Sequence, residues 1–126
     1  MAKILIVDDD VAVHFGLGSL LINRGHEVAS AATAGEAIAL VTGSPYDTIV
    51  LDNRLEAAGG DAGLRVLRAL RDAATRPWVI FVTGTGSAAL KRAALELGAD
   101  RYFEKPVSAL ELAGIIEEFG GPVKVA

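Results

Sequence analysis

The chain has 126 residues, of which 52% are hydrophobic and 22% charged, and it contains no cysteine. This composition is typical of one globular domain and excludes a disordered chain, a disulfide framework and a thiolate metal site. The net charge of -4, without a Lys/Arg run, argues against direct nucleic-acid binding, and no apolar run approaches the roughly 20 residues of a membrane span. We therefore expect a cytoplasmic protein without membrane contact.

Strand-like and helix-like segments alternate along the chain. Short apolar runs predict strands at 4–7, 27–31, 48–51, 78–82 and 101–103. Apolar residues at spacings of three and four predict helices at 11–24, 33–42, 62–72, 88–97 and 109–119. This alternation predicts an α/β fold: a doubly wound, five-stranded parallel sheet with helices on both faces. We expect the domain to cover residues 1–120, with 121–126 as a tail or the start of a linker.

Local signals mark several of the helix ends. Thr33 and Glu36 have the spacing of a capping box, and Ser108 is the expected N-cap of the last helix. Gly25 and Gly98 follow the first and fourth helices, where a glycine ends a helix well.

Polar residues follow four of the predicted strands. Asp8, Asp9 and Asp10 follow the first strand, and Asp52, Thr83 and Lys105 end the third, fourth and fifth. In a parallel sheet these residues meet at one edge, where such sheets bind ligands. Two carboxylates 4 Å apart repel by about 4 kcal/mol at an effective dielectric of 20, so the cluster needs a neutralising cation. Mg²⁺ is suited to such oxygen ligands.

These residue types suit phosphoryl transfer. A carboxylate can attack phosphorus and form an aspartyl-phosphate, while a metal, a lysine and a hydroxyl stabilise the equatorial oxygens. Because a carboxylate is already ionised, no general base is required. The sequence offers none beside Asp52, since His14 and His26 fall in or after the first helix, where we expect them away from this edge.

Four motifs together resemble the response-regulator receiver domain of two-component signalling, the CheY-like superfamily. They are Ile4 to Asp10, Tyr46 to Asp52, Val79 to Gly84 and Gly98 to Pro106, and the resemblance covers about Lys3 to Phe119. It implies a flavodoxin-like fold with strand order 2-1-3-4-5. It also implies a phosphorelay phosphoprotein and signalling phosphoacceptor rather than an enzyme, with only self-phosphorylation from phosphodonors and slow autodephosphorylation.

The resemblance also implies a role for each site residue. Asp52 is the phosphorylation site. Asp9, Asp52 and the backbone carbonyl of Arg54 bind Mg²⁺, with Asp8 helping indirectly. Thr83 and Lys105 contact the phosphoryl group, Tyr102 rotates on activation, and Pro106 follows a cis peptide bond.

Partners follow from the same resemblance. The expected phosphodonor is a sensor histidine kinase or a histidine phosphotransfer protein. Phosphorylation is expected to change the surface of the fourth helix, fifth strand and fifth helix. That surface would be read by a downstream protein target, by a missing output domain or by a second copy in a phosphorylation-dependent homodimer.

The segment after Asp52 departs from the family pattern. Residues 53–63 lack the usual proline and look two or three residues longer. The resemblance therefore does not extend to the geometry of this loop, on which kinase docking and phosphate lifetime depend. We also hypothesise that Arg54, with Thr85, tunes dephosphorylation by controlling water access.

Three other functions share some of these features. A phosphatase of the haloacid dehalogenase type would use Asp8 and Asp10, but Ala12 does not fit its opening motif. A flavodoxin-like flavin protein needs a phosphate loop where this chain has three aspartates, which would repel the phosphate. A receiver-fold interaction module that is never phosphorylated also stays open.

Overall fold

The computed structural model describes residues 2–53, 62–71, 76–84 and 86–119. Strands and helices alternate in chain order as the sequence predicts. The strands are β1 (Lys3–Val7), β2 (Glu27–Ala31), β3 (Thr48–Asp52), β4 (Trp78–Thr83) and β5 (Arg101–Glu104). The helices are α1 (Val11–Asn23), α2 (Ala34–Gly43), α3 (Ala62–Arg71), α4 (Ala88–Glu96) and α5 (Ala109–Glu118).

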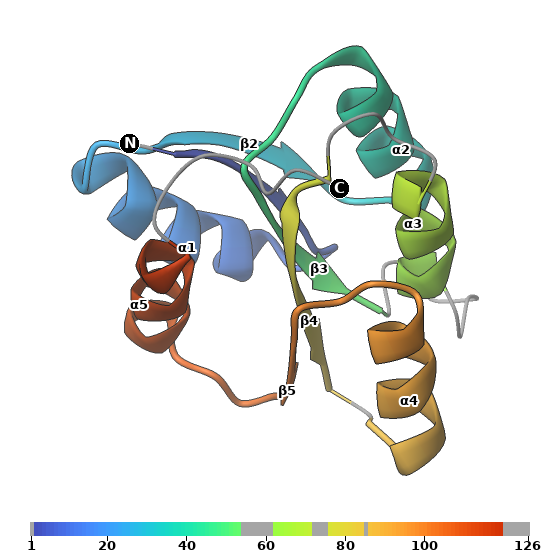
Figure 1. The fold of residues 1–126 in the computed structure, drawn as a ribbon. Coiled ribbons are helices and arrows are strands. Elements are labelled where there is room, and N and C mark those ends of the chain that lie inside the picture. Colours follow the sequence, from blue (N-terminus) through green and yellow to red (C-terminus); the bar gives the residue numbers. More distant parts are fainter. Residues whose placement is uncertain (1, 54–61, 72–75, 85, 120–126) are drawn as a thin grey trace.

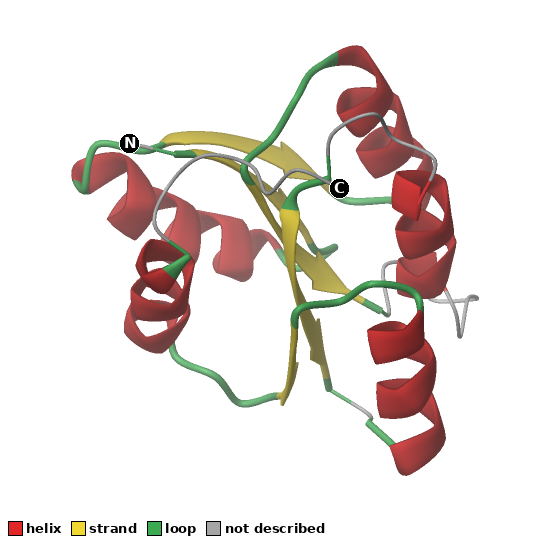
Figure 2. Cartoon of the chain, in the orientation of Figure 1, coloured by secondary structure: helices red, strands yellow, loops and turns green. Residues whose placement is uncertain are grey.

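The strands form one parallel sheet in the order β2-β1-β3-β4-β5, which confirms the predicted fold class and strand order. Helices α1 and α5 cover one face of the sheet, and α2, α3 and α4 cover the other (Figures 1 and 2). The chain reverses direction across the sheet between β1 and β3, so the carboxyl ends of these two central strands lie side by side at the switch point.

The core lies in two layers because alternate residues of a strand point to opposite faces. Odd-numbered strand residues such as Leu5, Ile49 and Phe81 pack with α2, α3 and α4, whereas Ile6 and Ile80 pack with α1 and α5. Strands β1, β3 and β4 are buried on both faces, which is why they read as continuous apolar runs in the sequence.

The expected helix caps are present. The Thr33 and Ser108 hydroxyls accept hydrogen bonds from the backbone N–H groups of Glu36 and Glu111, at 3.1 and 3.0 Å. Gly25 and Gly98 have φ of 90° and 113°, a left-handed conformation that glycine adopts without strain. Among the residues described, no helix has the length and apolar content needed to cross a membrane.

Candidate functional site

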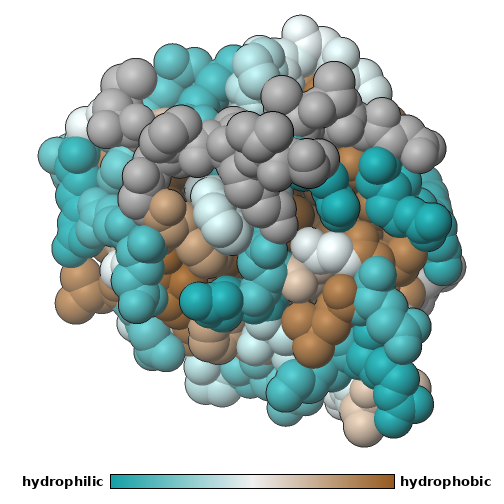
Figure 3. All heavy atoms as spheres, in the orientation of Figure 1, coloured by the Kyte–Doolittle hydropathy of each residue, from teal (hydrophilic) through white to brown (hydrophobic). Residues whose placement is uncertain are grey.

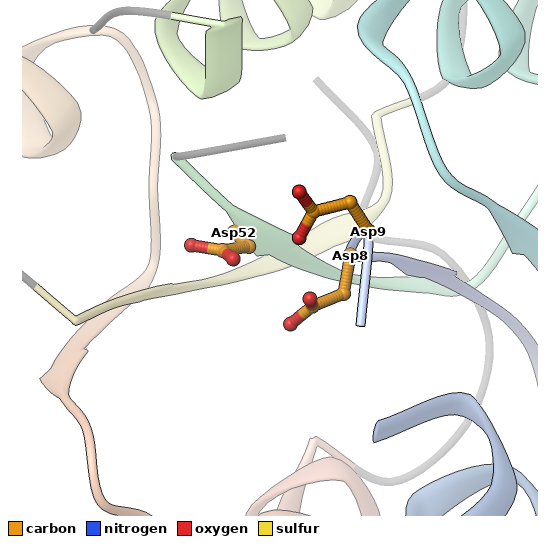
Figure 4. Close-up of side chains that lie close together, drawn as sticks. All are labelled: Asp8, Asp9 and Asp52. Atoms are coloured by element: carbon orange, nitrogen blue, oxygen red, sulfur yellow. The ribbon is translucent and has the colours of Figure 1, made fainter. Parts of the chain in front are cut away.

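The parallel pairing of β1 with β3 brings their terminal aspartates together. Val7 pairs with Leu51, so Asp8 and Asp52 leave neighbouring strands at the same level. Each of Asp8, Asp9 and Asp52 offers one carboxylate oxygen, and these oxygens all lie within 4.8 Å of one another. Figure 4 shows the three side chains gathered at the ends of these strands. The predicted acidic cluster is therefore present.

Burial differs within this acidic cluster. Asp8 and Asp52 are only 4% and 5% exposed, whereas Asp9 is exposed. Buried carboxylates so close together need positive charge, and hard oxygen ligands are those that Mg²⁺ prefers. The carboxylates of Asp8, Asp9 and Asp52 thus fit a divalent cation.

Lys105 reaches into the acidic cluster from the end of β5. Its Nζ lies 3.0 Å from Asp8 Oδ2 and 3.4 Å from Asp52 Oδ2. Partial burial acts to lower the pKa of Lys105, but the hydrogen bond to Asp8 and the charges of Asp52 and Asp8 outweigh it and raise the pKa above its ordinary value. The ammonium therefore stays charged at neutral pH, where it can pair with a carboxylate or a phosphoryl oxygen.

The turn after β1 is fixed by local contacts. Asp8 Oδ1 accepts a hydrogen bond of 2.9 Å from the Asp10 backbone N–H, and Asp10 Oδ1 accepts one of 2.9 Å from Ala12 as the N-cap of α1. His14 Nε2 contacts the backbone carbonyl of Asp8. The expectation that His14 lies away from this edge was wrong, because its place in the first turn of α1 points the ring back over the end of β1.

The remaining predicted residues lie on β4 and β5. Thr83 is fully buried at the end of β4, one residue beyond Val82, which pairs with Asp52. The Lys105 backbone N–H donates a hydrogen bond of 2.8 Å to the Thr83 carbonyl, which ties the two strand ends together. The Lys105–Pro106 peptide bond is cis, as predicted.

Tyr102 lies on β5, facing the α4 side of the sheet. Its ring stacks on Phe81 with centroids 5.9 Å apart, and its hydroxyl lies close to Gly86 and Glu104, where a Cβ on Gly86 would overlap both. Burial raises the pKa of the Tyr102 phenol, and the Glu104 carboxylate raises it further. Tyr102 is thus half-buried, with its ring packed in the core and its hydroxyl at the loop before α4.

Two predicted residues, Arg54 and Thr85, fall outside the described residues. The two ends of the unusual segment are described. The Gly63 backbone N–H donates a hydrogen bond of 3.2 Å to the Asn53 carbonyl, and Asn53 itself is 3% exposed. Asn53 is not among the site residues predicted from the sequence, although it directly follows Asp52.

A hollow of about 460 Å³ continues from the acidic cluster toward α1 and α5. Asp8, Asp10, Asp52 and Lys105 line its polar end, and its other walls are apolar: Ile6, Val7, Val13, Val50, Val82, Pro106, Val107 and Leu112. Open space therefore adjoins the Asp52 carboxylate, so an external group can approach it.

Comparison with known proteins places this chain in a family. The family model for the response regulator receiver domain matches residues 4–117. The transcriptional regulatory protein YvrH of Bacillus subtilis is 37% identical over 116 residues, which are 91% of this chain and 47% of that protein. The chain thus spans about half the length of the curated relatives it matches.

Solved structures agree with this match. A CheY-like response regulator receiver domain protein from Methanospirillum hungatei has a TM-score of 0.84 and 33% identity, covering 94% of this chain and 93% of that one. A response regulator protein from Burkholderia pseudomallei, solved with a phosphorylated aspartic acid, calcium ion and citrate, has a TM-score of 0.81 and 28% identity, covering 92% and 66%.

The fold and the strand-end cluster define a doubly wound signalling domain with an acidic site at its switch point. This chain belongs to the response regulator receiver domain family of two-component systems. The resemblance drawn from the sequence is confirmed, and it favours a receiver domain over a phosphatase of the haloacid dehalogenase type and over a flavin protein.

Proposed function

We propose that Asp52 accepts a phosphoryl group in a Mg²⁺-dependent reaction, with the phosphohistidine of a sensor histidine kinase or a histidine phosphotransfer protein as donor. One observation carries the proposal. The Asp52 carboxylate lies within 4.8 Å of two further carboxylate oxygens and 3.4 Å from the Lys105 ammonium, and a hollow opens beside it. The chain acts as a signalling phosphoacceptor and not as a turnover enzyme.

The chemistry assigns a task to each residue. An Asp52 Oδ attacks phosphorus, a P–O bond forms, and the P–N bond to the donor imidazole breaks with its electron pair left on nitrogen. Lys105 and the Thr83 hydroxyl stabilise charge on the phosphoryl oxygens. Asp9, Asp52 and the Arg54 carbonyl would hold Mg²⁺, with Asp8 supporting them indirectly, and the bound cation would supply further charge neutralisation.

The surface expected to change on phosphorylation is formed by α4, β5 and α5. We propose that phosphorylation draws Thr83 toward the phosphoryl group and lets Tyr102 leave its place beside Gly86 and Glu104. The contact of Lys105 N–H with the Thr83 carbonyl supports this coupling, because it links β4 to β5 directly. A downstream target, an output domain or a second copy would read the change.

The exposed apolar side chains of α1 support a donor-docking surface. Val11 and Phe15 are 76% and 77% exposed and lie one helical turn apart. The N-terminus of α1 follows Asp10 directly, so Val11 lies in the helical turn next to the acidic cluster and Phe15 lies one turn further along. Large exposed apolar groups next to a site that must receive another protein's histidine fit a contact surface for that protein.

The proposal is tested by incubating the chain with acetyl phosphate and Mg²⁺ and measuring its intact mass. We expect the mass to rise by one phosphoryl group, and the gain to be absent without Mg²⁺ and in Asp52→Ala. A chain that gains no phosphoryl group would instead be a phosphorylation-independent interaction module, which would contradict the proposal.

The docking surface is tested with a phosphohistidine protein that phosphorylates the unaltered chain. Phe15→Ser should slow transfer from this protein about tenfold or more through loss of a buried aromatic contact, while phosphorylation by acetyl phosphate stays unchanged. Ile22→Ser is the matched control, since Ile22 is 58% exposed on the same helix but about 10 Å further from the site. If both variants slow transfer equally, the proposal that Val11 and Phe15 form a docking surface is wrong.

The Arg54 and Thr85 hypothesis stays a prediction. It is checked by measuring the half-life of the aspartyl-phosphate in Arg54→Ala and in the unaltered chain. An unchanged half-life would contradict the hypothesis.

A further inference from the structure

A second hollow lies at the end of the molecule opposite Asp52. Helices α3 and α4 each begin at the carboxyl edge of the sheet and run back, so their last turns meet at the amino edge of β4 and β5. The hollow between them has a volume of about 510 Å³, a size typical of small-molecule sites. It is lined by Arg68, Arg71, Arg76, Ala93, Glu96, Leu97 and Gly98.

This α3–α4 hollow is strongly basic in a chain whose net charge is -4. Three guanidinium groups face it against one carboxylate, that of Glu96. Within the described part of the chain, Arg68, Arg71 and Arg76 are joined to no other residue by an ion pair or a side-chain hydrogen bond. Their donors are therefore available to a ligand.

Helix electrostatics account for two of these arginines but not for the third. Arg68 and Arg71 lie in the last turn of α3, where basic side chains offset the helix dipole. Arg76 precedes β4 and is half-buried. Its guanidinium packs over Gly98, so closely that a Cβ at position 98 would overlap it. The fold thus holds a third, partly desolvated cation at the same hollow.

The lining selects the kind of ligand. Guanidinium groups bind phosphate through paired N–H donors, and several of them together favour an anion with more than one phosphate. Ala93 on α4 and Leu97 at its C-cap, four residues further on, give an apolar wall on which a planar base can lie. Glu96 repels phosphate but accepts hydrogen bonds from hydroxyl or amino groups. The surface over α4 is otherwise largely hydrophilic (Figure 3).

We infer that the α3–α4 hollow is a binding site for a nucleoside polyphosphate. The phosphates lie on Arg68, Arg71 and Arg76, and the nucleoside lies against Ala93 and Leu97. This site is separate from the acidic cluster and does not depend on the proposed phosphorylation of Asp52.

Isothermal titration calorimetry with ATP, inorganic pyrophosphate and adenosine tests the site. The titrations contain EDTA, so that no metal–nucleotide complex binds at the acidic cluster. We expect ATP to bind more tightly than pyrophosphate and adenosine not to bind. Arg76→Gln should weaken ATP binding about tenfold or more, because paired charge-assisted hydrogen bonds are lost. Arg76→Lys should bind ATP with an affinity between those of Arg76→Gln and the unaltered chain, since lysine keeps the charge but not the paired N–H donors of a guanidinium.

Two controls separate this site from general charge effects. Arg92→Gln removes an exposed arginine of α4 that does not line the hollow, and Asp52→Asn alters the other end of the molecule; both should bind ATP as the unaltered chain does. Circular dichroism melts show that each variant is folded. The inference fails if ATP does not bind at about 10 mM, if Arg92→Gln weakens binding as much as Arg76→Gln, or if pyrophosphate binds as tightly as ATP.

Discussion

Gly63 stands where the first turn of α3 passes against the end of β3. A Cβ at this position would lie 2.7 Å from the Asn53 Cα and 3.0 Å from both the Asp52 carbonyl oxygen and the Phe81 ring. The two nearest neighbours are backbone atoms, which cannot rotate away. Gly63→Ala should therefore destabilise the protein by about 1–3 kcal/mol, as overpacking does in other cores. Urea unfolding measures the change.

Gly114 offers the matched control, because it lies inside α5 with open space around it. Gly114→Ala should stabilise the protein by about 0.5–1 kcal/mol through helix propensity. A neutral or stabilising Gly63→Ala would show that β3 and α3 can separate without cost. That result would contradict the close approach of Gly63 to Asn53 and Asp52.

At the scale of elements, one carboxylate joins the ends of α1 and α5. Glu117 accepts from Arg24 Nη1 at 2.7 Å and from His26 Nε2 at 3.1 Å. His26 Nδ1 accepts from the Ala2 backbone N–H at 3.0 Å, so the neutral ring carries its proton on Nε2. The hydrogen bond from His26 is the largest cause that lowers the pKa of Glu117; burial opposes it, and the charge and hydrogen bond of Arg24 add to the lowering.

Because the pKa of Glu117 is lower in the folded state than in the unfolded state, the sign of the pH dependence of stability is fixed. The contribution of Glu117 to stability is fully present above the unfolded-state pKa of about 4.3 and is lost as the pH falls through the lower folded-state value. Because the group is exposed, we expect Glu117→Gln to cost less than about 1 kcal/mol at pH 7. The difference from the unaltered chain should vanish in strong acid and shrink in high salt.

Denaturant unfolding at several pH values checks this, with Glu118→Gln as the control. Glu118 is an exposed neighbour on α5 that makes no ion pair with the described residues. A Glu117→Gln deficit that stays constant down to low pH would show that packing, and not charge, joins the two helices.

At the scale of the whole molecule, charge is unevenly distributed between the two ends. The carboxyl edge of the sheet gathers Asp8, Asp9 and Asp52 against the single ammonium of Lys105, while the opposite end holds the arginines of the α3–α4 hollow. Repulsion within the acidic cluster destabilises the metal-free fold, and a cation bound there stabilises the folded state by mass action.

Asp9→Asn separates these two effects. Asp9 is exposed and makes no ion pair with any residue in the described ranges, so its removal in EDTA should stabilise the protein by up to about 1 kcal/mol. Mg²⁺ at one hundred times its Kd should stabilise the unaltered chain by about 2.7 kcal/mol, which appears as a rise in melting temperature. The same variant should lose most of this stabilisation.

Thermal melts with and without Mg²⁺ measure both quantities. Glu96→Gln, which removes a charge at the other end of the molecule, should leave the Mg²⁺ response unchanged. An Asp9→Asn variant that responds to Mg²⁺ as the unaltered chain does would place the cation elsewhere.

The sequence by itself determined the order and type of the elements and most of the acidic site. Strand and helix periodicities are local properties, and in a parallel sheet a residue that follows a strand must lie at the carboxyl edge. The proximity of Asp8, Asp52 and Lys105 could therefore be predicted from the sequence. Family membership followed from the same strand-end residues.

Only the tertiary structure decided contacts that depend on how helices pack on the sheet. Helix rotation turns His14 toward the Asp8 carbonyl and leaves Phe15 in solvent, although the two are adjacent in sequence. The chain shows no basic run, yet the packing of α3 beside α4 brings Arg68, Arg71 and Arg76 to one hollow. Side-chain direction between packed elements is a long-range property, so spacing along the chain cannot reveal it.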